Sequence, residues 1–378
     1  MKFLHISDLH LGKRVNEISL IEDQKYILAQ ILNAAEQNKV DGVLIAGDVY
    51  DKSVPPTEAV QLFDEFLVQL CALKIPAYII SGNHDSAERI SFGGRLMTSS
   101  GVFFSPVYAG CVTPISLEDE YGPLNIYLLP FVKPAHVRRF FEEEEIASYT
   151  DALRVAIKGM SIDAAARNIL VTHQFVTGST RSESEEVSVG GTDNVDAAVF
   201  ADFDYVALGH LHKPQNCGER IRYCGTPLKY SFSEAKDEKT LTLVECKGKG
   251  QVCVELLPLA PLREMREIRG SYEDLTRKSY YEGTALCTDY LRVTLTDEDD
   301  IPDASARLRV IYKGLMELRY DNARTRKNAE IGGATEVEKK SPKELFAEFF
   351  ELQNNAPMSK EQSELVSSLI EKIWEEEV

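Results

Sequence analysis

The chain has 378 residues, of which 44% are hydrophobic, so it can build one large domain with smaller additions. No apolar run reaches the roughly 18 residues that a membrane-spanning helix needs, and the N-terminus is typical of a strand and not of a signal peptide. The seven cysteines are scattered without a C-x-x-C pair, so we expect reduced thiols, a cytoplasmic location and no membrane partner.

The formal net charge of −18 argues against a nonspecific coat of nucleic acid, because such binding rests on neutralising phosphates. Residues 262–340 differ from the rest, since 15 basic and 16 acidic side chains nearly balance there. The basic residues of this segment either contact DNA or form an ordinary solvated face.

Five apolar runs in the first 212 residues predict buried strands, and each is followed by a short motif rich in histidine and aspartate. The runs are residues 3–6, 43–46, 78–80, 169–171 and 205–208, and the motifs after them are Asp8-Leu9-His10, Gly47-Asp48-Val49-Tyr50-Asp51, Gly82-Asn83-His84-Asp85, Thr172-His173 and Gly209-His210-Leu211-His212. Open α/β sheets bind ligands at the carboxyl ends of their strands, so the motifs predict one common site for two metal ions.

Helical spacing of apolar residues predicts helices around residues 21–35 and 60–70, between the first three strands. Residues 178–196 are polar and glycine-containing, which predicts a loop. Further strands are expected at 222–224, 241–244 and 252–256. The alternation of strands and helices indicates an α/β domain over residues 1–260.

A second region, residues 262–335, combines a predicted strand at 290–295 with an acidic turn and a predicted helix at 304–316, so we expect a small α+β unit. Residues 328–340 are typical of a linker. Residues 341–378 predict a helical pair, because Ser341 with Glu344 and Ser359 with Gln362 are helix-start signals followed by apolar stripes. These stripes pack either on this chain or on a partner.

Taken in order, the five motifs resemble those of the calcineurin-like metallophosphoesterase superfamily. The opening residues 2–12 and the run 47–56 narrow the resemblance to the SbcD family of bacterial nucleases, most strongly over residues 1–230. The resemblance implies a four-layer sandwich of two β-sheets flanked by helices, followed by a small DNA-capping domain.

The resemblance also assigns seven metal ligands. It places Asp8, His10 and His212 on the first ion, lets Asp48 bridge both ions, and gives Asn83, His173 and His210 to the second. Mixed nitrogen and oxygen ligands suit two Mn²⁺ ions, with Mg²⁺, iron or Zn²⁺ as alternatives. Two such ions can hold phosphodiester oxygens and activate a water.

Catalytic roles fall on His84 and Asp51. The resemblance makes His84 a catalytic imidazole that is not a permanent ligand, able to donate a proton or stabilise charge. Asp51 stands where other branches of the superfamily carry a second histidine, so we expect it to neighbour His84 through hydrogen bonds. Asp85 is a candidate to orient His84.

We therefore expect an Mn²⁺-dependent DNA exonuclease and endonuclease acting at ends and hairpins. The resemblance implies a homodimer through helices near the second and third motifs. It also implies an SbcC-type coiled-coil ATPase bound by residues 341–378 in double-strand-break processing. The alternatives are a stand-alone phosphodiesterase for small nucleotides and a catalytically silent scaffold that recruits an ATPase to DNA.

Ordinary structural roles compete with functional ones at a few positions. His5 faces away from the motif on its strand, so a role in the core is expected. Lys13 and Arg14 either contact DNA phosphates or are solvated. Residues 225–232 resemble a family segment near the metal site and either contact substrate or support the site.

Overall fold

The computed structural model describes residues 1–180, 194–323, 325, 346–351 and 357–376, with only the backbone at 371–376. It divides into two compact units. The first contains Met1–Glu267 and Thr288–Leu291, and the second contains Ile268–Cys287 and Arg292–Val378. Among the described helices, none combines the length and hydropathy needed to cross a membrane. All seven cysteines are free thiols.

Two six-stranded sheets form the centre of the first unit. One sheet has the strand order β16-β15-β1-β4-β5-β6, with bounds Val252–Pro258, Thr240–Cys246, Lys2–Ile6, Gly42–Ala46, Ala77–Ile80 and Val102–Phe104. The other has the order β13-β14-β12-β9-β8-β7, with bounds Gln215–Asn216, Ile221–Tyr223, Tyr205–Gly209, Arg167–His173, Gly122–Leu128 and Ile115–Asp119. β1, β4 and β5 run parallel to one another, as do β9 and β12, so the five predicted motif strands are all present and direct their carboxyl ends alike within each sheet.

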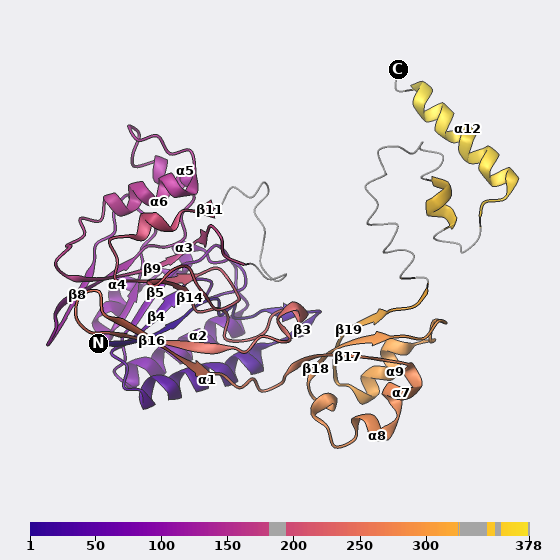
Figure 1. Ribbon diagram of the computed structural model, residues 1–378, viewed down its shortest axis with the longest axis horizontal. Coiled ribbons are helices and arrows are strands. Elements are labelled where there is room, and N and C mark those ends of the chain that lie inside the picture. The colour runs from indigo at the N-terminus through magenta and orange to yellow at the C-terminus, as the bar shows by residue number, and fades with distance from the viewer. Residues whose placement is uncertain (181–193, 324, 326–345, 352–356, 377–378) are drawn as a thin grey trace. The chain divides into compact units, whose positions relative to one another are not determined.

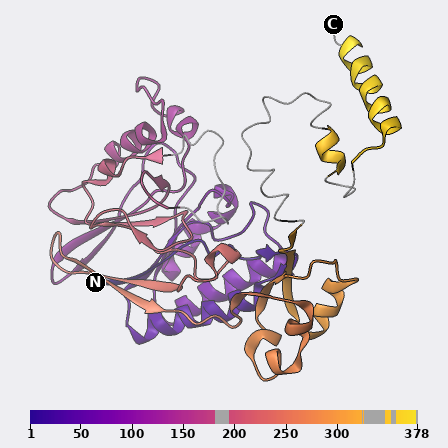
Figure 2. The same ribbon diagram turned by 45° about the vertical axis from the view of Figure 1, so that its right-hand side comes forward.

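Helices cover the outer face of each sheet. Helices α1 (Ile21–Gln37) and α2 (Thr57–Ala72) lie on one side, and α5 (Pro134–Arg138) and α6 (Tyr149–Lys158) lie on the other, with the strands between them in both views (Figures 1 and 2). Both predicted helices between the early strands are confirmed as α1 and α2. The order helix, sheet, sheet, helix is the expected four-layer α/β sandwich.

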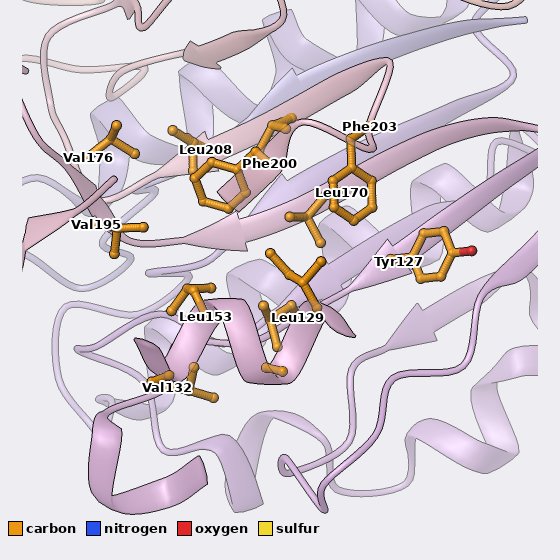
Figure 3. Packing of buried hydrophobic residues seen from close by; sticks show 14 of the residues in the cluster. Tyr127, Leu129, Val132, Leu153, Leu170, Val176, Val195, Phe200, Phe203 and Leu208 are labelled. Atoms are coloured by element: carbon orange, nitrogen blue, oxygen red, sulfur yellow. The ribbon is translucent and has the colours of Figure 1, made fainter. Parts of the chain in front are cut away.

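Two apolar cores hold these layers together. The core between the sheets joins Phe3, Leu44 and Ile80 of the first sheet with Ile126, Ile169 and Ala207 of the second. The second core lies between the second sheet and the helices around α6. Figure 3 shows its members Tyr127, Leu129, Val132, Leu153, Leu170, Val176, Val195, Phe200, Phe203 and Leu208. Because side chains alternate along a strand, strands of the second sheet contribute to both cores.

Shorter elements fill the connections of the first unit. They are β2 (Arg14–Val15), β3 (Ile18–Ser19), α3 (Ala87–Ile90), α4 (Gly94–Met97), β10 (Phe175–Val176), β11 (Asn194–Val195) and the 3₁₀ turns η1 (Thr98–Ser100), η2 (Ala197–Phe200) and η3 (Phe232–Glu234). Most of the predicted loop at 178–196 lies outside the described residues.

The second unit contains most of a three-stranded sheet of order β17-β18-β19, formed by Met265–Gly270, Tyr290–Leu295 and Gly314–Tyr320. Its helices are α7 (Tyr272–Thr276), α8 (Lys278–Tyr281) and α9 (Ala304–Ile311), with the turn η4 (Ala285–Cys287). The predicted helix at 304–316 is wrong in its second half, because α9 ends at Ile311 and β19 begins at Gly314. Leu315 and Met316 are buried as strand residues, and a short apolar run of this kind does not distinguish helix from strand.

Helix α12 (Lys360–Glu376) ends the described chain. Its predicted start is confirmed, since the main-chain N–H of Ser359 donates to Gln362 Oε1 and that of Gln362 donates to Ser359 Oγ, at 2.8 and 3.2 Å. Residues 346–351 are also helical. The predicted linker 328–340 and the helix start at Ser341 lie outside the described residues.

Candidate metal centre

The five motifs occupy the carboxyl ends of β1, β4, β5, β9 and β12. His173 is the last residue of β9 and pairs with Gly209 of β12, so the fourth and fifth motifs are neighbours across one sheet. The first and second motifs are neighbours across the other, because the main-chain N–H groups of Asp8 and His10 donate to the carbonyl oxygens of Gly47 and Asp48, both at 3.0 Å. The packing of the two sheets then brings both pairs together.

Four of the predicted ligands have a left-handed backbone. The φ angles are 53° at Asp8, 42° at His10, 49° at Asp48 and 101° at His210. Side-chain-bearing residues rarely adopt such angles, and they persist only where surrounding contacts enforce them, most often at functional sites. Here one such contact is visible, since the N–H of His210 donates to both carboxylate oxygens of Asp8 at 3.1 Å.

Two glycines allow the strand ends to approach closely. A Cβ at Gly82 would lie 2.1 Å from Asp48 Oδ1, and a Cβ at Gly209 would lie 1.9 Å from the carbonyl oxygen of Ala46. Any side chain at either position would therefore push the motifs apart.

The first group of ligands consists of Asp8, His10 and His212, all buried. The Nε2 atoms of His10 and His212 lie 3.2 Å apart, and one ligand atom from each of the three residues falls within 4.8 Å of the others. Asp8 also accepts a hydrogen bond from Ser7 Oγ. This set matches the residues that sequence resemblance assigns to the first ion.

The second group consists of Asn83, His173 and His210. Asn83 Oδ1 lies 2.9 Å from His173 Nε2 and 3.0 Å from His210 Nδ1. His173 Nδ1 donates to the carbonyl oxygen of Ala46 at 2.8 Å, because a carbonyl can only accept. A metal ligand must be a neutral ring, and His173 Nε2 would then present its lone pair beside Asn83 Oδ1, so that one cation could accept both donors.

Asp48 lies between the two groups. Its Oδ2 is 3.3 Å from His173 Nε2 and 3.9 Å from Nε2 of both His10 and His84, while its Oδ1 accepts the N–H of His84 at 2.9 Å. Burial would raise the pKa of Asp48, but attraction by the surrounding imidazoles outweighs it and lowers the pKa. A charged carboxylate in this place is suited to bridge two cations.

The charge balance of the site favours bound cations. Burial lowers the pKa of His173, yet Asp48 and Asp8 attract positive charge strongly enough to raise it to about 9. Burial and repulsion from Asp48 raise the pKa of Asp8, which means that its charged form is unfavourable there. A cation nearby would stabilise that charged form. The nitrogen and oxygen donors thus fit two divalent metal ions. Such ions would take the place of the proton that His173 binds in the metal-free protein.

His84 and Asp51 lie beside this centre. His84 Nδ1 donates to the main-chain oxygen of Asp51 at 3.0 Å, which leaves Nε2 on the side of Asp48. The carboxylate of Asp51 is directed elsewhere, because its Oδ1 accepts from Lys13 Nζ at 2.7 Å and lies 3.7 Å from His10 Nδ1. The expected hydrogen bond between the two residues therefore involves the main chain of Asp51.

Asp85 has a different role from the expected one. Its carboxylate accepts the N–H groups of Val49, Tyr50 and Gly82 at 2.9–3.1 Å, and so ties the second motif to the third. The main-chain oxygen of Asp51, and not Asp85, holds the His84 ring. Asp85 is a clamp on the backbone that carries the ligands.

Several supporting residues were missed by the sequence analysis. Gln24 Nε2 donates to the carbonyl oxygen of His10 at 2.7 Å. Tyr230 packs its ring edge-on against His10 and His212, and its hydroxyl donates to the Leu9 carbonyl. Glu234 and Lys239 lie behind His212. The only sequence signal for these residues was the resemblance of segment 225–232 to a family segment near the metal site. Its buried Tyr230 supports the site by contacting the rings of His10 and His212.

His5 has the expected core role. It is fully buried, with Nδ1 2.9 Å from the Tyr205 hydroxyl and Nε2 3.2 Å from the Leu208 carbonyl, so it joins the two sheets.

The fold and the donor set define a class. Residues 1–214 match the family model described as calcineurin-like phosphoesterase, which covers more than half of the chain, so this chain belongs to that family. A second model, described as type 5 capsule protein repressor C-terminal domain (SbcD_C), matches residues 261–354.

The resemblance to SbcD is confirmed by a full-length relative. The chain is 32% identical over 385 aligned positions to a protein of Staphylococcus epidermidis that is named as the D component of the nuclease SbcCD. The alignment covers all of both proteins.

Solved structures of other proteins are more distant. A dimetal phosphatase from Danio rerio is 11% identical, with 69% of this chain and 99% of that chain covered and a TM-score of 0.40. A Thermus thermophilus protein is also 11% identical, with 68% and 98% covered and a TM-score of 0.35. Likeness at this level adds nothing to the family assignment.

Proposed function

We propose that this chain is an Mn²⁺-dependent DNA nuclease that hydrolyses phosphodiester bonds at DNA ends and hairpins. The observation that carries the proposal is the convergence of seven nitrogen- and oxygen-bearing residues from five strand ends, with the charged carboxylate of Asp48 between the two groups. The full-length relative named as part of a nuclease supports a nucleic acid as the substrate over other phosphoesters.

The proposed ligands form the two groups described above, and both ions share Asp48. They are Asp8, His10 and His212 for one ion and Asn83, His173 and His210 for the other. Bound divalent ions supply Lewis acidity toward the phosphodiester and lower the pKa of water. The protein holds the donors in place through the strained backbone and the clamp of Asp85.

His84 is the proposed acid–base residue. Its Nδ1 proton is engaged by the Asp51 carbonyl, so proton exchange with substrate falls to Nε2. As a neutral ring, Nε2 accepts a proton, and as an imidazolium it donates one to a departing oxygen. Asp51 remains a proposed catalytic-site residue that acts through His10, Lys13 and the orientation of His84.

Substrate class is tested by one assay series. Blunt, end-blocked and hairpin DNA are compared with bis-p-nitrophenyl phosphate and a cyclic dinucleotide, each with Mn²⁺, Mg²⁺ or chelator, and with and without an SbcC-type ATPase. We expect DNA to have the highest catalytic efficiency with Mn²⁺. Equal efficiency on the small diesters would favour a stand-alone phosphodiesterase, and no hydrolysis of any substrate would favour a silent scaffold.

An SbcC-type coiled-coil ATPase is the proposed partner of residues 341–378. In the described part of this segment, apolar side chains of the helices are exposed, among them Phe346, Phe349, Leu365 and Leu369. Amphipathic helices of this kind dock their apolar face on a partner. Deleting 341–378 should abolish the pull-down of the ATPase and leave a folded Mn²⁺-dependent nuclease.

A homodimer is the second proposed assembly. Phe92 and Leu96, in the segment of α3 and α4 after the third motif, are 85% and 83% exposed. Large apolar side chains that are this exposed and close together are typical of interaction surfaces. Light scattering should show a dimer for the native protein and a monomer for the double variant Phe92→Glu and Leu96→Glu.

A further inference from the structure

Both histidines of the first ligand group have a carboxylate behind the ring. Their Nε2 atoms face each other at 3.2 Å, while their Nδ1 atoms point outward. His10 Nδ1 lies 3.7 Å from Asp51 Oδ1, and His212 Nδ1 lies 3.6 Å from Glu234 Oε1. Lysines hold both carboxylates, Lys13 at 2.7 Å from Asp51 and Lys239 at 2.6 Å from Glu234. The arrangement behind His212 repeats the one behind His10.

The pair of Glu234 and Lys239 is almost completely buried, at 0% and 6% exposure. Lys239 Nζ donates to Glu234 Oε2, to Thr226 Oγ1 at 2.7 Å and to the main-chain oxygen of His212 at 3.0 Å. All three protons of the ammonium group are thereby used. A buried ion pair gives little net stability compared with apolar side chains, so its hydrogen bonds to and beside His212 indicate a role in holding that residue.

The chemistry of the carboxylate sets the tautomer of the ring. A carboxylate only accepts hydrogen bonds, so its negative charge 3.6 Å from His212 Nδ1 favours a proton on that nitrogen over a lone pair. Nε2 then presents its lone pair toward Asp8 and His10. The ring of Tyr230, 6.1 Å from that of His212, limits rotation away from this orientation.

We propose that Glu234, held by Lys239, is a positioning residue that fixes His212 as the Nδ1–H tautomer and so prepares the first metal site. The proposal rests on the metal centre of the proposed function, but not on DNA as its substrate. Ligand histidines in metalloproteins commonly use such outer carboxylates, whose loss weakens metal binding by about 10- to 100-fold.

The wild-type, full-length, metal-free protein gives the first test. Two-bond ¹H–¹⁵N spectra of protein labelled at its seven histidines report which ring nitrogen carries the proton. The His212 signal is assigned by its loss in His212→Asn. We expect the proton on Nδ1, and a proton on Nε2 would overturn the proposal without bearing on nuclease activity.

Variants give the second test, with Mn²⁺ binding measured by calorimetry in the absence of DNA. Glu234→Leu should weaken one of the two Mn²⁺ sites by about 10- to 100-fold and leave the other unchanged. Glu234→Gln, which keeps the volume and an acceptor but not the charge, should weaken the same site by a smaller factor. If the leucine variant fails to fold, Glu234→Gln still tests the proposal. Unchanged Mn²⁺ affinity at both sites of the glutamine variant would contradict the positioning role.

The control is Asp204→Asn. Asp204 is another buried carboxylate of the same unit, paired with Lys249 at 2.8 Å and bonded to the N–H groups of Asn168 and Gly250. This variant should lower the melting temperature but leave both Mn²⁺ affinities unchanged. An equal loss of Mn²⁺ affinity in Asp204→Asn would show that Glu234 acts only through overall stability.

Discussion

The metal centre and helix α12 follow opposite rules of burial. In the metal centre charged and polar side chains are buried, and Glu234 and His173 have no solvent exposure at all. On α12 apolar side chains are exposed, with Leu365 at 60% and Leu369 at 49%. Burying charge is costly unless partners satisfy it, and exposing large apolar side chains is unfavourable unless another surface covers them. According to the proposed function, bound metal ions satisfy the buried charges of the metal centre, and a partner protein covers the apolar side chains of α12.

Removing the shared carboxylate should have the largest effect. Asp48→Ala takes away the only proposed ligand that reaches both groups of donors, so both metal sites should be lost and turnover should fall by roughly 1,000-fold or more, as when one member of a catalytic unit is deleted. Elemental analysis and a DNA cleavage assay measure the two quantities. Asp48→Asn, of nearly equal volume, separates loss of the charge from loss of the side chain. An alanine variant that keeps both ions would contradict the bridging role.

Replacing His84 should affect turnover without removing the ions. His84→Ala deletes an imidazole whose Nε2 is 3.9 Å from Asp48 but which belongs to neither proposed ligand group. We expect turnover to fall by about 100-fold or more, the usual scale of general acid–base assistance, with the metal content unchanged. Loss of metal in this variant would make His84 a ligand and would remove its proposed role.

Charged substitutions on the exposed face of α12 should weaken only the binding of the partner. The double variant Leu365→Glu and Leu369→Glu should weaken binding of the SbcC-type ATPase by at least about 10-fold, since a carboxylate cannot be buried in an apolar interface without cost. Nuclease activity without partner should be unchanged. Ser368→Glu adds a like charge at an exposed polar position and should bind normally. Equal weakening by both variants would indicate a general charge effect.

The sequence could point to one cluster for the proposed ligands because their signal is local. Asp8, Asp48, Asn83, His173 and His210 each lie at the end of a recognisable apolar run, and strand ends of a sheet meet in space. The supporting residues could not be found in the same way. Glu234 and Lys239 stand in a turn and at the edge of β15, with no periodicity that points toward His212, and only the packing of two sheets makes them its neighbours.

The strand and helix boundaries of the second unit show a different limit of prediction from sequence. The strand at Tyr290–Leu295 was predicted to the residue because apolar side chains alternate along it. The helix at 304–316 was extended too far, since Leu315 and Met316 continue its apolar pattern across Gly314. Pairing with other strands, which the local pattern does not contain, decides the structure there.

The smallest predicted effect concerns His5, a buried polar residue of the same unit that takes no part in the metal groups. Burial between the sheets and repulsion from Arg222 lower its pKa to about 3. Below pH 6.5 the unfolded chain binds a proton at this residue that the folded chain does not, so stability falls as the pH drops from 6.5 toward 3. Between pH 7 and pH 5 this contribution is about 2 kcal/mol. Urea unfolding of the metal-free protein should therefore show a pH-dependent loss that is smaller by about 2 kcal/mol in His5→Gln than in the wild type. Identical pH slopes for the two proteins would mean that His5 is charged in the folded core.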